Sequence, residues 1–170
     1  MAYESSVPYR AGTEGYTSFR IPAVVRTRSG TVLALAEGRR VHLRHCDDGA
    51  TWHRADAVST DGAETLRSPS RPQAGLAGPV CRGSTLSLHD HRTLLFAGPA
   101  HPAARALLTL CAGRDGGLTW PTAHPVSGLP AACSDLVRLD PDTVGQLHET
   151  GDFSAYSTIT FRRIPVEEPR

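Results

Sequence analysis

Two arginines stand out in the segment YTSFRIPAVVRTRSGTVLALAEGRR, residues 16–40, because they lie among the small and apolar residues of strand-like runs. They are Arg20 and Arg39. A guanidinium group has a planar set of donors that matches the oxygens of a carboxylate or phosphate, so such residues can bind an anion. The chain has 18 Lys and Arg against 17 Asp and Glu, a net charge of +1. No global charge attracts nucleic acid or an anionic membrane, and anion binding must be local.

The spacing of the cysteines and histidines does not indicate a metal site. Cys46, Cys81, Cys111 and Cys133 form no CxxC pair, and the 8 histidines form no HExxH motif. We expect thiols without a bound metal, and the sequence implies no cofactor.

Both arginines lie on runs with the period of a β-strand. Residues 19–26 alternate between two faces, so Arg20 points away from its apolar neighbours. Pro22 has no N–H to donate, which places this strand at a sheet edge or at its first pairing. Ser29-Gly30 predicts a turn, and residues 31–39 predict a second strand that carries Arg39. The segment is therefore predicted to be a hairpin with polar ends.

Further short apolar runs follow at nearly even spacing and predict an all-β chain. With 16 glycines and 13 prolines scattered between them, they cover residues 41–46, 54–58, 84–88, 92–98, 106–112, 134–139, 143–149 and 156–164. We expect a loop at 68–79. Such a meander is typical of a sandwich, barrel or propeller. No apolar run is long enough to span a bilayer and no leader pattern opens the chain, so we expect a soluble protein, cytoplasmic by default.

A repeated turn favours the propeller among these folds. The pattern DxGxTW occurs at residues 47–52 and again at 115–120, each time after one apolar run and before another. The Asp can accept hydrogen bonds from its own turn, the Gly can adopt a left-handed backbone, and the Trp can pack beneath. We interpret both motifs as structural turns of repeated four-stranded units and assign neither Asp47 nor Asp115 a catalytic role.

With these motifs the chain resembles the exo-α-sialidase (neuraminidase) family of glycosidases. The resemblance runs in family order through SVPYRAGTEGY, FRIPAVVRTRSGTVLALAEGRR, GPVCRGSTLSL, LLFAGPA, GRDGGLTWP, AACSDLVRLD and GQLHETGD. It implies a six-bladed β-propeller with Asp-box turns on its rim. Residues 1–170 then form a single incomplete domain with strands for about three blades. Family segments are missing after Arg40 and around residues 68–78.

The resemblance gives the arginines a role. In the family, three arginines from different blades bind the carboxylate of sialic acid. Arg20, in FRIP, matches the first, and Arg105, in PAARALLTL, matches the third. The second is Arg67, in TLRSPSRPQA, or Arg71 in the same segment. Arg39 matches another arginine in the wall of the site.

The remaining site residues follow from the same resemblance. Glu149, in LHETGD, matches a glutamate that orients the first arginine. Cys133, in ACSDL, stands where the family has its nucleophilic tyrosine. A cysteine side chain is shorter than that of tyrosine, so its sulfur would not reach the position of the phenol oxygen. The acid/base aspartate beyond AEGR and the central glutamate of an Asn-Glu motif have no match in this chain.

Three functions remain open on the sequence alone. The first is hydrolysis of terminal sialic acid from glycoconjugates, and the second is non-catalytic binding of sialic acid, as in a lectin. The third is an inactive propeller fragment without a ligand. The expected partner is a sialylated glycoconjugate or free sialic acid. Because half a ring exposes strand edges, we also expect self-association unless a partner completes the propeller.

Overall fold

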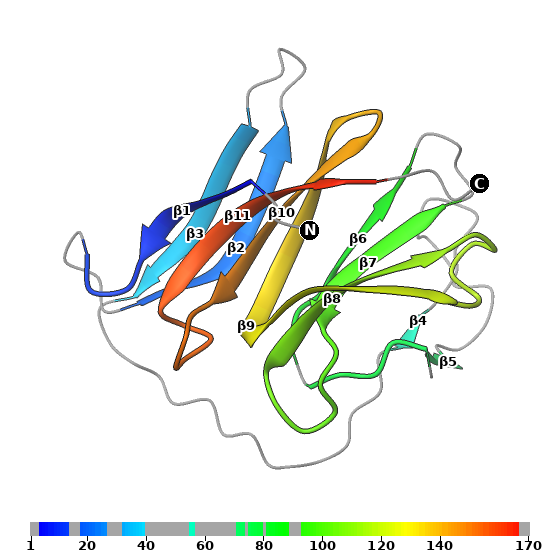
Figure 1. Cartoon of the computed structure of the whole chain (residues 1–170), viewed down its shortest axis with the longest axis horizontal. Coiled ribbons are helices and arrows are strands. Elements are labelled where there is room, and N and C mark those ends of the chain that lie inside the picture. The colour runs from blue at the N-terminus through cyan, green and yellow to red at the C-terminus, as the bar shows by residue number, and fades with distance from the viewer. Residues whose placement is uncertain are drawn as a thin grey trace, which may run out of the picture.

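Every element in the described part of the chain is a β-strand (Figure 1). The computed structural model describes residues 4–13, 18–26, 32–39, 55–56, 71–73, 75–79, 81–88 and 93–166. Its strands are β1 (Ser5–Arg10), β2 (Ser18–Arg26), β3 (Val32–Arg39), β4 (Ala55–Asp56), β5 (Arg71–Pro72), β6 (Ser84–Ser87), β7 (Leu94–Pro99), β8 (Ala106–Gly113), β9 (Thr122–Asp140), β10 (Thr143–Thr150) and β11 (Thr158–Pro165). The all-β prediction is confirmed.

Seven of these strands form one antiparallel sheet in the order β1-β11-β10-β9-β8-β7-β6. Strand β9 has 19 residues and belongs to both halves of it. Its first half pairs with β8 as far as Pro130, and its second half pairs with β10 from Ala131 onward. The register shifts between Ala106 and Leu108, across Leu107, whose φ is 60°, and again between Leu108 and Thr109, as expected for a bulge that bends a sheet. The sheet is thus two four-stranded units that share β9.

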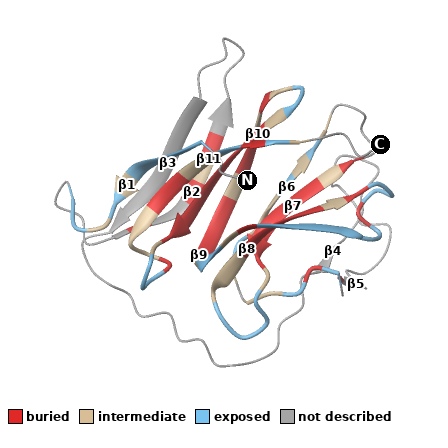
Figure 2. Cartoon of the chain, in the orientation of Figure 1, coloured by how far each residue is buried: buried red, intermediate tan, exposed pale blue. Residues whose placement is uncertain are grey.

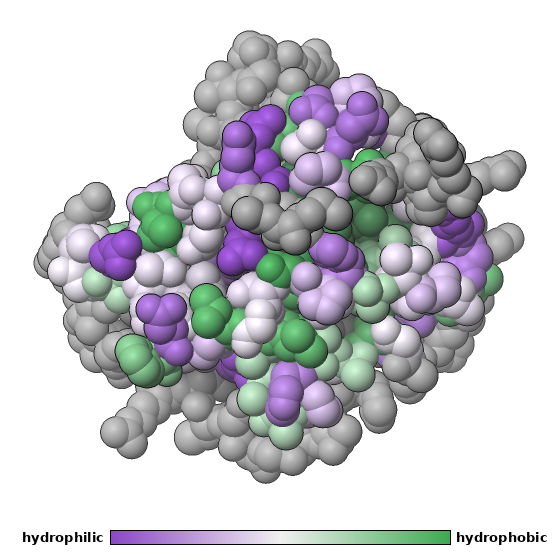
Figure 3. All heavy atoms as spheres, viewed as in Figure 1, coloured by the Kyte–Doolittle hydropathy of each residue, from purple (hydrophilic) through white to green (hydrophobic). Residues whose placement is uncertain are grey.

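The two units pack against each other through an apolar core. Strands β7, β8 and the first half of β9 contribute one side, and the second half of β9, β10 and β11 contribute the other (Figure 2). The buried members are Leu95, Ala97, Leu108, Leu110, Val126, Ala131, Leu136, Val144 and Ile164. On the face shown in Figure 3, described hydrophobic residues appear only in small groups among hydrophilic ones.

The β2–β3 hairpin packs on the unit formed by β9, β10, β11 and β1. It covers the face of this unit that points away from the core between the two units. Its core consists of Phe19, Val24, Val137, Leu139, Leu147 and Ile159, and the ring of Tyr9 in β1 lies 5.1 Å from that of Phe19. The hairpin prediction is confirmed, with Val25 opposite Leu33. Strict alternation along β2 was wrong, since Phe19 and Val24 face the same core. The register shifts between Arg20 and Ala23, where buried Pro22 donates no N–H, and the bulge exchanges the faces.

Three segments form strands that were not predicted from the sequence. The first half of β9 contains Pro125, Gly128 and Pro130, which suggest a turn, yet it pairs with β8 along a mostly exposed edge. Strand β1, which has no apolar alternation, pairs with β11 and so completes the second unit with the N-terminal segment. The short strand β5 lies in the segment expected to be a loop. No helix in the described ranges could cross a membrane.

Candidate functional site

Asp135 connects three strands that are distant in sequence. Its Oδ2 accepts a hydrogen bond from the Val24 N–H in β2 at 2.8 Å. Its Oδ1 accepts one from the Ser84 hydroxyl in β6 at 2.7 Å, and the Ser84 Oγ accepts the Leu136 N–H at 3.1 Å. The carboxylate therefore holds β2 and β6 on either side of β9, which places the chain segments around Cys133.

Cys133 lies in β9 next to a second thiol. The Cys81 S–H donates to the Cys133 Sγ over 3.7 Å, and the Ser134 N–H donates to the Arg82 carbonyl at 3.2 Å. Cys133 is buried, whereas Cys81 is partly exposed. The hydrogen bond to Cys133, together with burial, raises the pKa of the Cys81 thiol far above its ordinary value. Cys81 is thus a neutral donor toward the sulfur of Cys133.

Glu149 is fully buried at the end of β10 and reaches the same strand. Its Oε2 accepts the Cys133 N–H at 3.2 Å. This contact is possible because the β9–β10 register shifts between His148 and Thr150, which leaves the Cys133 N–H outside the regular ladder. The carboxylate therefore fixes the backbone of Cys133.

Arg105 approaches from the start of β8. Its carbonyl accepts the Ala131 N–H at 2.8 Å. Its guanidinium group donates to the Tyr156 hydroxyl and has its central carbon 5.9 Å from the centre of that ring. The charge of Arg105 lowers the pKa of Cys81 while that of Glu149 raises it, in addition to the larger effects above. Both charges therefore act on the thiol pair.

Three of the residues predicted from the sequence are thus brought together: Cys133, Glu149 and Arg105. For Arg20 and Arg39 only the backbone is described, with Arg20 opposite Glu37 and Arg39 opposite Ser18 in the β2–β3 register. Their side chains lie outside the described residues. The same holds for all of Arg67, while the backbone of the alternative residue Arg71 pairs with Asp56. The expected contact between Glu149 and Arg20 stays a prediction.

Sequence reasoning missed three residues of this region: Cys81, Asp135 and Tyr156. Cys81 lies in the matched segment GPVCRGSTLSL, but its partner is 52 residues away and no local pattern joins them. Tyr156 lies in the turn between β10 and β11, and only the fold brings its hydroxyl to Arg105. Within the described residues, no group of three His, Cys, Asp or Glu could hold a metal ion.

The turn at residues 115–120 has the hydrogen bonds that its sequence predicts. Asp115 accepts the Thr119 N–H at 2.9 Å and the Thr119 hydroxyl at 2.7 Å. Gly116 and Gly117 have φ values of 73° and 84°. The Trp120 ring lies 6.1 Å from that of Phe96. The other copy of the motif, residues 47–52, lies outside the described residues.

In sequence, the chain is similar to two fungal exo-α-sialidases. It is 36% identical over 81 residues to the protein of Arthroderma benhamiae and 35% identical over 82 residues to that of Aspergillus fumigatus. Each match covers 47% of this chain but only 20% of the relative, so it spans about a fifth of those proteins. No protein-family model matches the chain.

In structure, the chain is similar to the intramolecular trans-sialidase of Ruminococcus gnavus, solved with oseltamivir carboxylate. The TM-score is 0.57 at 19% sequence identity, over 93% of this chain and 35% of that one. This is a likeness of fold. The chain is an incomplete β-propeller of the sialidase type, as its sequence predicts.

Proposed function

We propose that the chain has a sialidase-like function and binds a terminal sialic acid, free or on a glycoconjugate, at the site of Arg105, Cys133 and Glu149. The observation that carries this proposal is their convergence. Arg105 directly precedes β8, Cys133 lies in β9 and Glu149 is the last residue but one of β10, yet Glu149 bonds the backbone of Cys133 and both charges act on the adjoining thiol of Cys81. The resemblance assigns these positions to substrate binding, chemistry and orientation.

Arg105 is the residue suited to the sialic acid carboxylate. Its guanidinium group is held by the Tyr156 hydroxyl, so less side-chain freedom is lost when a ligand binds. A guanidinium group can donate two parallel hydrogen bonds to one carboxylate. Strand β2 lies beside β9 through the Val24–Asp135 bond, and in this proposal Arg20 supplies a second guanidinium group from that strand. Arg39 and either Arg67 or Arg71 are the remaining arginines of the proposed sialic acid site.

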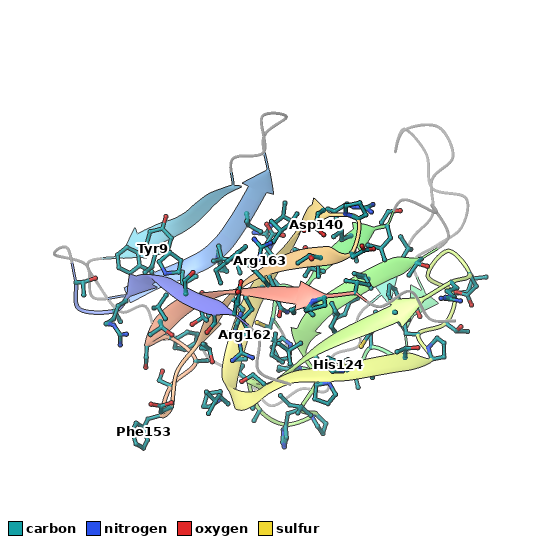
Figure 4. All side chains as sticks on the ribbon, turned by 45° about the horizontal axis from the view of Figure 1, so that its top comes forward. Tyr9, His124, Asp140, Phe153, Arg162 and Arg163 are labelled. Carbon is teal, nitrogen blue, oxygen red and sulfur yellow. The ribbon has the colours of Figure 1, made fainter. Side chains whose placement is uncertain are left out.

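Binding can be tested by titrating the whole chain with free sialic acid in a calorimeter. Arg105→Ala should weaken binding at least tenfold, or by about 1.4 kcal/mol. Arg163→Ala is the matched control, because Arg163 is an exposed residue of β11 that pairs with Glu4 at 3.6 Å and Asp140 at 3.9 Å (Figure 4). Equal affinity of the two variants, or no binding by the parent chain, contradicts the proposal.

Hydrolysis is the next step of the same proposal, with Cys133 in the place of the nucleophile, and its shorter side chain should make turnover slow. Release of the fluorophore from a fluorogenic sialoside should then exceed a buffer blank and disappear in Cys133→Ala but not in Cys111→Ala. Cys111 is a suitable control because it is also buried, but in the separate cluster with Phe96 and Leu76.

A second candidate is a non-catalytic sialic-acid-binding module. The contact of the Cys133 sulfur with the Cys81 thiol favours it, since the sulfur faces another side chain of the same protein. Sialic acid binding without release of the fluorophore supports the binding module. Neither binding nor release identifies an inactive propeller fragment.

A further inference from the structure

The segment that contains Cys81 runs alongside the segment that contains Cys133, in the same direction. Three contacts occur in order along the two segments: Cys81 Sγ to Cys133 Sγ at 3.7 Å, Ser134 N to Arg82 O at 3.2 Å, and Ser84 Oγ to Asp135 Oδ1 at 2.7 Å. The two sulfurs are 3.7 Å apart, and a disulfide bond would bring them to about 2.0 Å.

We propose that Cys81 and Cys133 are a redox-active pair that closes to a disulfide when a hydroperoxide oxidises the chain. The structure has no bond between the two sulfurs, which contact each other at 3.7 Å. The bond would link residues that are 52 positions apart and would tie the segment before β6 to β9.

The reaction balances with one molecule of hydrogen peroxide. The Cys133 thiol loses its proton and attacks one peroxide oxygen, an S–O bond forms, the O–O bond breaks, and the departing hydroxide combines with the proton that Cys133 released to give water. The resulting sulfenic acid is then attacked by the sulfur of Cys81. The S–S bond forms, the S–O bond breaks, and the hydroxide leaves as water with the Cys81 proton. Two thiols are oxidised and one peroxide is reduced to two waters.

The geometry indicates which cysteine attacks the peroxide and which one then attacks the sulfenic acid. The hydrogen bond runs from the Cys81 S–H to the Cys133 sulfur, so it stabilises negative charge on Cys133, which attacks first. Cys81 keeps its proton and resolves the sulfenic acid. Cys133 is 9% exposed, which suits a small oxidant such as peroxide better than a bulky disulfide.

The consequence for the site rests on the function proposed above. Oxidation removes the Cys133 thiol from the site while Arg105 and Glu149 keep their contacts, so hydrolysis would stop before binding is lost. The disulfide itself depends only on the positions of the two sulfurs. It can therefore form, and be detected, even if the chain binds no sialic acid.

Peptide mapping of the whole chain tests the disulfide directly. Trypsin places the four cysteines on separate peptides, residues 45–54, 68–82, 106–114 and 115–138. The reduced chain is treated with equimolar hydrogen peroxide, alkylated, digested without reductant and analysed by mass spectrometry. We expect peptides 68–82 and 115–138 to be joined with the loss of two hydrogens, and dithiothreitol to separate them. Cys46 and Cys111 should be alkylated.

Two variants test the assigned order. In Cys81→Ser the sulfenic acid of Cys133 should persist and be trapped by dimedone, whereas Cys111→Ser should form the same cross-link as the parent chain. The proposal is overturned if Cys81 and Cys133 are both alkylated after peroxide treatment, or if the cross-links found join other cysteines or different chains. The map of the parent chain decides this even if a variant fails to fold.

Discussion

Asp115 and Asp135 each accept two hydrogen bonds, but over very different distances along the chain. Asp115 bonds the N–H and hydroxyl of Thr119, four residues away, in an exposed turn. Asp135 bonds Val24 and Ser84, which are 111 and 51 residues away, in a partly buried position between strands. The first carboxylate shapes a turn, and the second joins three segments of the fold.

The difference matters for stability because water can replace the partners of only one of them. If the Asp115 side chain is removed, solvent reaches the turn. If that of Asp135 is removed, the N–H of buried Val24 and the hydroxyl of half-buried Ser84 lose their acceptor, and an unsatisfied buried polar group costs about 1–3 kcal/mol. Buried polar groups should therefore affect the response of this chain to substitution and pH more than exposed ones do.

The largest expected effect on the free energy of unfolding comes from His148 at acidic pH. It is fully buried in β10, and burial, with a smaller contribution from the Arg162 charge, lowers its pKa from 6.5 to about 3. The unfolded chain takes up a proton below pH 6.5 while the folded chain does not, so stability is complete above pH 6.5 and falls as the pH falls toward 3. At pH 4 the loss is about 3 kcal/mol, at about 1.4 kcal/mol per pH unit.

Urea denaturation at several pH values measures this loss. His148→Gln should remove the part of the pH dependence that lies between pH 6.5 and 4. His124→Gln, a change at an exposed residue in the first half of β9, should keep it (Figure 4). Parallel pH profiles of the parent chain and His148→Gln would mean that His148 is not held neutral by burial.

Asp135→Ala should have the next largest effect, a loss of about 2 kcal/mol in the free energy of unfolding at pH 7. Asp135→Asn should lose about half as much, because its amide keeps one acceptor oxygen for Val24 or Ser84. Urea midpoints at constant slope measure both. If Asp135→Ala and Asp115→Ala have the same midpoint, the distinction between the two aspartates is wrong.

Local chemistry explains which parts of the fold the sequence could predict. The turn at Asp115 and the β2–β3 hairpin depend on residues next to one another, and both were predicted. The bulge at Pro22, the bend at Leu107 and the pairing of β1 with β11 depend on strands meeting across the chain. No periodicity within one segment encodes them.

The residues of the candidate site also divide into those that the sequence could predict and those that it could not. Cys133, Glu149 and Arg105 were found because each sits in a segment that resembles sialidases, and the structure brings these three together. Cys81, Asp135 and Tyr156 were missed because their partners are more than 50 residues away. Resemblance identifies positions within matched segments, but the contacts of those positions depend on strand register.

Tyr156→Phe tests a contact that is intermediate between those of Asp115 and Asp135, since both Tyr156 and Arg105 are partly buried. Loss of the hydroxyl that accepts from Arg105 should lower the free energy of unfolding by about 1 kcal/mol. If the guanidinium group binds sialic acid, affinity should fall as well, while Tyr9→Phe should leave it unchanged. An unchanged affinity in Tyr156→Phe would separate the stability role of this pair from ligand binding.

Asp115→Ala should have the smallest effect, with a fall in the urea midpoint less than half of that in Asp135→Ala. Its hydrogen bonds to Thr119 lower the pKa of Asp115 below its ordinary value of 3.8. A lowered pKa makes the folded chain more stable above pH 3.8, and this contribution is lost as the pH falls through the pKa of the folded state. Asp115→Asn should therefore differ from the parent chain at pH 6 and approach it as the pH falls below 3.8. A difference that persists at low pH would show that Asp115 shapes the turn through a contact that does not need its charge.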